Sequence, residues 1–270
     1  DSTVNLSDNV YIYYAPITAY PYYSLTSEKQ AELNGKYADF EEKWSVYKNH
    51  LFVWDYCANF DNPFLYYPTV QAIKANMQTY KNLGVKYLQT QDIHAMRGSW
   101  TAEMKAYIAG RLAWNVQADP YELRNEFVRY YFGEAGYSKA LGFMQAIEDR
   151  FAEVASGAAD YFGVFSEKIS GSEVFTKRLT EDLLSYIVGA MNDTKNAALT
   201  SEQKAVYLNR LRRLKTTVLY LQLINREAYG YDSDTIKSVA TEFFAIADEF
   251  SISGTGLDDK LDELRKLAQN

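Results

Sequence analysis

Cysteine and histidine are scarce in this sequence of 270 residues, which contains one cysteine, Cys57, and two histidines, His50 and His94. A single cysteine excludes a disulfide within the chain, and two histidines cannot complete a zinc site without carboxylate ligands. The G-x-S-x-G, phosphate-loop, G-x-G-x-x-G, H-E-x-x-H and EF-hand patterns are also absent from the sequence. We therefore predict no metal and no cofactor.

Long apolar runs and clusters of basic residues are missing as well. No stretch of about 18 apolar residues occurs that could span a bilayer. The 28 Lys and Arg residues are outnumbered by 35 Asp and Glu, which gives a net charge of -7. A nucleic-acid-binding protein usually carries a cluster of basic residues, which this sequence lacks. We therefore predict neither nucleic acid nor membrane as a partner. Because the chain starts at Asp1 without an initiator Met or an apolar signal segment, we expect a processed protein or a piece of a longer one.

Aromatic residues are abundant, with 24 Tyr, 14 Phe and 4 Trp. Tyrosine and tryptophan combine an apolar ring face with a hydrogen-bonding tip. Such residues suit both polar-lined cores and sugar-binding clefts. The composition is therefore compatible with a carbohydrate site but does not distinguish it from a polar-lined core.

The first part of the sequence alternates between strand and helix patterns. Short β-branched and aromatic runs at Val10–Tyr14, Leu51–Trp54 and Val85–Leu88 predict three buried strands. The segments Phe40–Tyr47 and Thr69–Leu83 between them have helical patterns. Connections of this length predict parallel strand pairing with right-handed crossovers.

After Thr101 the sequence carries only helical periods. Asp119 and Pro120 form a strong helix start, because an aspartate caps the first turn and proline suits its first position. Gly133 is expected to end that helix, and later apolar stripes with spacings of three and four predict an antiparallel helical bundle. We therefore predict an α/β domain over residues 1–117 and an α-helical domain over residues 118–270.

Three parallel strands are too few to make a stable sheet that is buried on both faces. Two alternatives stay open at this point: an N-terminal part or a partner completes the sheet, or the chain forms a small three-layer α/β unit capped by helices. The unpaired edge along Val10–Tyr14 predicts self-association in the first case.

The second strand leads into the most informative segment of the chain. It ends in Trp54, Asp55 and Tyr56, and Asn59 follows in the next loop. In parallel α/β architectures the pocket lies beyond the carboxyl ends of the strands, so we expect these side chains to line it. Asp55 is the first candidate for a catalytic carboxylate or a ligand of sugar hydroxyls, and the other three are candidate sugar-binding residues. The alternative is that Trp54 and Tyr56 belong to the core and Asp55 caps a turn.

The third strand ends in a similar set of polar residues. Gln91, Asp92 and His94 are expected at the same rim, with Asp92 as the second candidate catalytic residue and the other two as candidate sugar ligands. Tyr14, at the end of the first strand, is expected to line a wall of the same cleft. A histidine in a loop is also compatible with an ordinary surface or packed residue, and the tyrosines near Tyr14 with simple packing.

Several short motifs, in this order, resemble those of a bacterial family of unknown function whose members look like glycoside hydrolases. They are Trp54-Asp55-Tyr56, Asn59-Phe60, Gly84-Val85-Lys86, Leu112-Ala113-Trp114-Asn115 and Tyr130-Tyr131-Phe132-Gly133. The resemblance implies a (β/α)8 barrel of the TIM type, similar to family 20 hexosaminidases and α-glucuronidases, followed by a helical domain. The three predicted strands would then be the last three of the barrel, which makes residues 1–117 its C-terminal portion and the missing N-terminal part its partner.

The sequence departs from that family at the end of the third strand. The family often has Phe-Glu-Gln-Gly there, whereas this chain has Gln89-Thr90-Gln91-Asp92, so the role of the glutamate is lost or passes to Asp92. We expect the C-terminal part of a secreted or cell-surface bacterial glycoside hydrolase, or another carbohydrate-active protein, that acts on poly- or oligosaccharide and is inactive as this chain alone. The alternative is a non-catalytic carbohydrate-binding or helical protein-interaction module.

Overall fold

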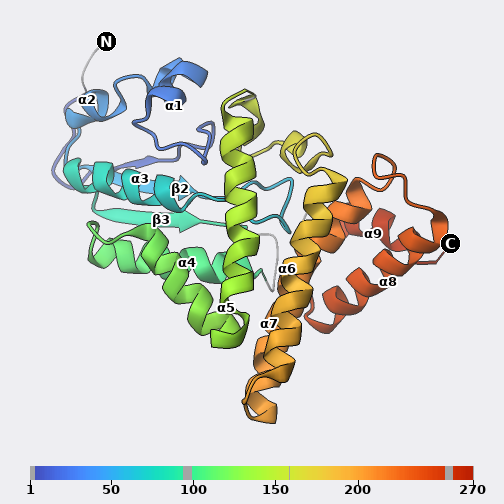
Figure 1. Ribbon diagram of the computed structural model, residues 1–270. Coiled ribbons are helices and arrows are strands. Elements are labelled where there is room, and N and C mark those ends of the chain that lie inside the picture. The colour runs from blue at the N-terminus through green and yellow to red at the C-terminus, as the bar shows by residue number, and fades with distance from the viewer. Residues whose placement is uncertain (1–3, 94–98, 158, 253–257, 270) are drawn as a thin grey trace.

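The computed structural model describes residues 4–93, 99–157, 159–252 and 258–269 (Figure 1). The elements of the first half are β1 (Ile12–Tyr14), α1 (Glu28–Leu33), η1 (Gly35–Tyr37), α2 (Phe40–Ser45), β2 (Leu51–Tyr56), α3 (Val70–Asn82), β3 (Tyr87–Gln91) and α4 (Trp100–Trp114). The second half contains α5 (Pro120–Ala155), η2 (Ala159–Phe162), η3 (Glu167–Ser170), α6 (Lys177–Asn196), α7 (Ser201–Ile224), α8 (Ser233–Glu249) and α9 (Asp258–Lys266).

The strands form one parallel sheet in the order β1-β2-β3. In its register Tyr13 lies beside Phe52, and Phe52 lies beside Tyr87. The parallel pairing agrees with the prediction from the crossover lengths. Because side chains alternate along a strand, this register places Tyr13, Phe52 and Tyr87 on one face of the sheet.

The two faces of the sheet differ in what covers them. Leu51 and Val53 are buried in a cluster that includes residues of α2 and α3, and Leu88 packs into the same side. On the opposite face, Tyr13 and Tyr87 are each 51% exposed and Phe52 is half-buried. Helices therefore cover one face of the sheet and leave an aromatic face open.

The expected fold, part of a (β/α)8 TIM-type barrel, is wrong. The described residues form a mostly helical structure with one small three-stranded sheet, and they show no barrel. Alternating strands and helices determine that neighbouring strands run parallel, but they do not determine how many strands the sheet contains. Here the covered face of the sheet packs against residues of α2 and α3, whereas the helices of the second half of the chain contribute to a separate buried cluster.

Helix α5 begins and breaks where the sequence predicts. The Asp119 side chain accepts hydrogen bonds from the backbone of Tyr121 and Glu122, with Pro120 in the first turn. At Gly133 the backbone leaves the helical region, with φ of 77° and ψ of 159°, and two helical pieces meet at an angle (Figure 1). A glycine is needed there because such dihedrals are essentially closed to other residues.

The largest buried cluster extends across the predicted boundary between residues 117 and 118. It contains Tyr66 and Trp100 from the first segment and Phe132, Phe151 and Leu214 from the second. The division into two domains stays a prediction, but the two segments share this core. In the described part of the chain, no helix combines the length and apolar character needed to cross a membrane.

Candidate functional site

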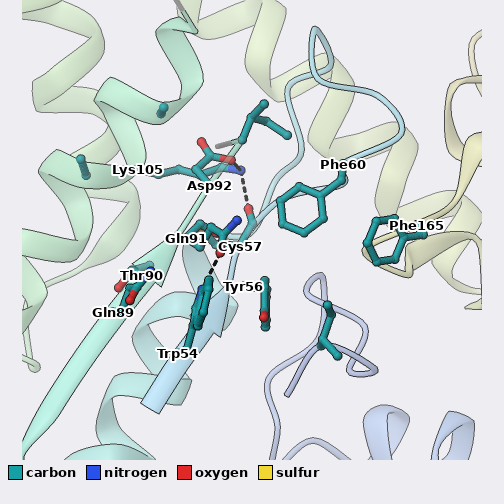
Figure 2. Close-up of a pocket in the computed structure, with 14 residues that line it drawn as sticks. Trp54, Tyr56, Cys57, Phe60, Gln89, Thr90, Gln91, Asp92, Lys105 and Phe165 are labelled. Carbon is teal, nitrogen blue, oxygen red and sulfur yellow. Dashed lines mark hydrogen bonds and ion pairs between the residues drawn. The ribbon is translucent and has the colours of Figure 1, made fainter. Parts of the chain in front are cut away.

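An open cavity of about 610 Å³ lies at the carboxyl ends of β2 and β3, next to the first turns of α4. Figure 2 shows aromatic side chains on one side of it and polar groups at the end of β3 on the other. The side chains that matter for its chemistry are Trp54, Tyr56, Phe60, Gln89, Gln91, Asp92, Lys105 and Phe165. The site therefore combines the open aromatic face of the sheet with a charged end.

Trp54 and Tyr56 form the aromatic side of the cavity. Two residues apart on β2, they point to the same face, and their rings lie 5.9 Å apart at an interplanar angle of 17°. The indole N–H of Trp54 donates to the side-chain oxygen of Gln91 at 2.5 Å, and the Tyr13 hydroxyl donates to that of Gln89 at 2.8 Å. These bonds orient the rings and the two amides with respect to one another.

Asp92 and Lys105 form the charged end. Only 2% of the Lys105 side chain and 9% of the Asp92 side chain are exposed, and Nζ lies 3.2 Å from Oδ1. Thr101 donates to the second Asp92 oxygen at 3.5 Å, and Nζ also donates to the Cys57 carbonyl (Figure 2). Both oxygens of Asp92 are thus held by the protein, which suits a group that orients or accepts hydroxyls.

Cys57 lines the same cavity but is not arranged as a nucleophile. Its thiol donates to the Gln91 carbonyl at 3.2 Å. Burial raises the pKa of the thiol, and the nearby Asp92 carboxylate raises it further. A reactive cysteine needs the opposite shift, toward the thiolate. Among the described residues, no group of three or more His, Cys, Asp or Glu side chains could hold a metal ion.

Asp55 faces away from the cavity. It is one residue from Trp54 and Tyr56 on β2 and therefore points to the covered face, where it is 7% exposed. Its carboxylate accepts from the Asn76 side chain at 3.2 Å and from the Tyr56 backbone at 2.9 Å. Burial raises the pKa of Asp55 to about 6, and the bonds from Asn76 and Tyr56 act in the opposite direction.

The remaining predicted ligands lie in different places. Tyr14 packs on the covered face against Trp44, with ring centroids 4.6 Å apart, and burial raises the pKa of its hydroxyl. Asn59 is 1% exposed, and its side chain bonds within the protein to the backbone of Gly163 and to Asn62. His94 lies outside the described residues. Of the predicted set, the structure brings Trp54, Tyr56, Gln91 and Asp92 together at the cavity.

Four of the cavity residues named above, Phe60, Gln89, Lys105 and Phe165, were not among the predicted site residues. Lys105 shares a three-and-four spacing with the buried residues Thr101, Ile108 and Leu112 of α4. A lysine within such a stripe was the available signal, because a buried charge needs a partner. Phe165 follows α5 in a segment that the sequence identifies only as a loop, so no pattern marked it.

Comparison with known proteins identifies a family to which the chain is similar. Residues 2–140 match the family model described as a domain of unknown function, DUF4838, which is more than half of the chain. The chain belongs to the DUF4838 family. No curated protein and no solved structure matches it. The DUF4838 region includes all of the cavity residues discussed above except Phe165.

Proposed function

We propose that this chain binds carbohydrate in the cavity, with the rings of Trp54 and Tyr56 as the platform. Sugar rings present apolar C–H faces and hydroxyl edges, so their sites combine aromatic faces with a few well-placed polar groups. One observation carries the proposal: two nearly parallel rings lie in one cavity with the amides of Gln89 and Gln91 and the carboxylate of Asp92.

The same geometry favours binding over hydrolysis by this chain alone. Glycoside hydrolysis uses two carboxyl groups about 5–10 Å apart on either side of the scissile bond. Within the described lining, Asp92 is the one carboxylate, and it is engaged by Lys105 and Thr101, while Asp55 lies behind the sheet. We therefore propose a sugar-holding part of a carbohydrate-active protein that acts on poly- or oligosaccharide outside the bacterial cell, in keeping with the family resemblance.

The test is a titration of the purified chain with cello-, chito-, xylo- and arabino-oligosaccharides, followed by intrinsic fluorescence. We expect at least one series to bind and to change the tryptophan emission. In Trp54→Ala the affinity should fall by about tenfold or more, because a stacked ring of this size buries apolar area worth roughly 1.5–3 kcal/mol. Release of reducing ends should stay at the background rate throughout.

Trp114→Ala is the matched control, because Trp114 is 94% exposed and does not line this cavity. Its affinity should equal that of the unmodified chain. The proposal is wrong if no series binds, or if Trp54→Ala and Trp114→Ala behave alike. Hydrolysis by the chain alone would contradict the assignment of binding without catalysis.

A further inference from the structure

A short segment from the second half of the chain is attached to the loop that follows β2. The Phe60 amide donates to the Val164 carbonyl at 2.7 Å. Asn59 donates through its side chain to Gly163 and Ser166 at 2.9 and 3.1 Å, and Asn62 also donates to Ser166 at 2.9 Å. These bonds join residues that are more than 100 positions apart, so the position of residues 163–166 is set by the tertiary structure.

Both asparagines are almost completely buried, each with 1% exposed, which makes the attachment rigid. Buried amides lose little to competition with water, and a hydrogen bond broken at such a site leaves a desolvated polar group. The neighbouring residue Val164 is buried as well. The backbone on both sides of Phe165 is therefore anchored to the loop after β2 by hydrogen bonds that are shielded from water.

Phe165 is 62% exposed in spite of this anchoring and lines the edge of the cavity. Its ring lies 5.5 Å from that of Phe60, which lies 6.0 Å from Tyr56 in an edge-to-face arrangement. Together with Trp54 these rings make a row along one side of the cavity (Figure 2). An aromatic ring held rigidly in water at the edge of a site gains most from a ligand that covers it.

We infer that Phe60 and Phe165 form a second sugar subsite, so that the ligand is an oligosaccharide extending from Trp54 toward the helical half of the chain. This inference depends on the proposed function and specifies that the bound carbohydrate is long enough to span two subsites. Two ring positions, Tyr56 and Phe60, lie between Trp54 and Phe165, and a single sugar ring covers only its nearest neighbours. Through the exposed side chain of Phe165, the helical half of the protein thereby favours longer oligosaccharides over shorter ones.

The experiment compares the mono-, di- and tetrasaccharide of each of the four series named above, by calorimetry with the full chain. The tetrasaccharide should bind more tightly than the monosaccharide. In Phe165→Ala its affinity should fall by about tenfold, as the loss of a covered phenyl ring implies, while that for the monosaccharide changes less than about twofold. Phe165→Tyr keeps the ring and should keep the length preference.

Tyr130→Ala serves as the control, because Tyr130 is 73% exposed on α5 and does not line the cavity. Circular dichroism melting of every variant checks that the fold is kept. The two proposals fail in different ways. Absence of Trp54-dependent binding overturns both, whereas Trp54-dependent binding that is equal for all lengths, or unchanged in Phe165→Ala, overturns the second subsite alone.

Discussion

Ionisation of Asp55 should make the folded protein less stable as the pH rises from about 4 to 7. Burial raises the pKa of this carboxyl from its ordinary value of 3.8 to about 6. Each pKa unit corresponds to about 1.4 kcal/mol, so the charged form costs the folded state about 3 kcal/mol. Below pH 4 the folded and unfolded chains both hold the proton and the cost vanishes. At higher pH the unfolded chain loses its proton first, and stability falls until the pH passes 6.

The variant Asp55→Asn removes this charge but adds a cost of its own. Asn76 donates to Asp55 and at the same time accepts from the Leu25 backbone at 2.8 Å, so its amide cannot turn around without losing a bond. The NH₂ group of an amide at position 55 therefore faces a second donor, either the Asn76 NH₂ or the Tyr56 backbone N–H, at a cost of roughly 1–3 kcal/mol that does not depend on pH. The effect of the Asp55 charge is therefore isolated only by the way in which the stability difference between the variant and the unmodified chain changes with pH.

The assay is urea unfolding of both proteins at pH 4 and pH 7.5. The variant should gain about 2–3 kcal/mol of stability relative to the unmodified chain between these two values. Asp8→Asn, which replaces an exposed carboxylate ahead of β1, is the control, and the change with pH measured for Asp55→Asn must exceed the change measured for it. A difference for Asp55→Asn that stays constant within about 0.5 kcal/mol would refute the assignment of Asp55 as a buried carboxyl.

Two further predictions concern packing and association. Gly133→Ala should destabilise the protein by more than about 2 kcal/mol in urea, because a Cβ would lie 2.7 Å from the Tyr207 ring at a positive φ. Gly110→Ala, in α4 with open space around it, should instead stabilise by about 0.5–1 kcal/mol, and equal effects of the two changes would contradict this reasoning. The open sheet face and the β1 edge should cause self-association at high concentration, which light scattering would detect and Tyr13→Lys would reduce; a monomer at every concentration speaks against it.

Much of the local structure could be predicted from the sequence. The three strands, the Asp119 cap and the break at Gly133 depend on side-chain pattern and backbone sterics over a few residues, and the structure contains each of them. The third strand, however, lies at Tyr87–Gln91 and not at the predicted Val85–Leu88, and of the three strands only β2 has buried residues. The same local rule separates Asp55 from its neighbours. Because side chains alternate along a strand, a residue between Trp54 and Tyr56 has to face the other side of the sheet. Applied strictly, that rule would have removed Asp55 from the predicted rim.

Such local rules could not predict how many strands the sheet contains. Alternating strands and helices predicted parallel pairing, but the expected barrel is absent from the described residues, where helices cover only one face. The number of strands in a sheet depends on what packs against it. The covered face of this sheet packs against α2 and α3, while Phe132 and Leu214 of α5 and α7 join a separate, larger cluster from positions far along the chain, and no local pattern encodes these contacts.

The sequence by itself determined which side chains could share a face, and it placed Trp54, Tyr56, Gln91 and Asp92 at the ends of neighbouring strands. Only the tertiary structure decided which face stayed open, paired Lys105 with Asp92 and brought Phe165 to the cavity. The physical reason is the separation along the chain over which each kind of interaction acts. Dihedral sterics and side-chain alternation act between residues close in the chain, whereas burial and ion pairing depend on segments that meet only after the whole chain has folded.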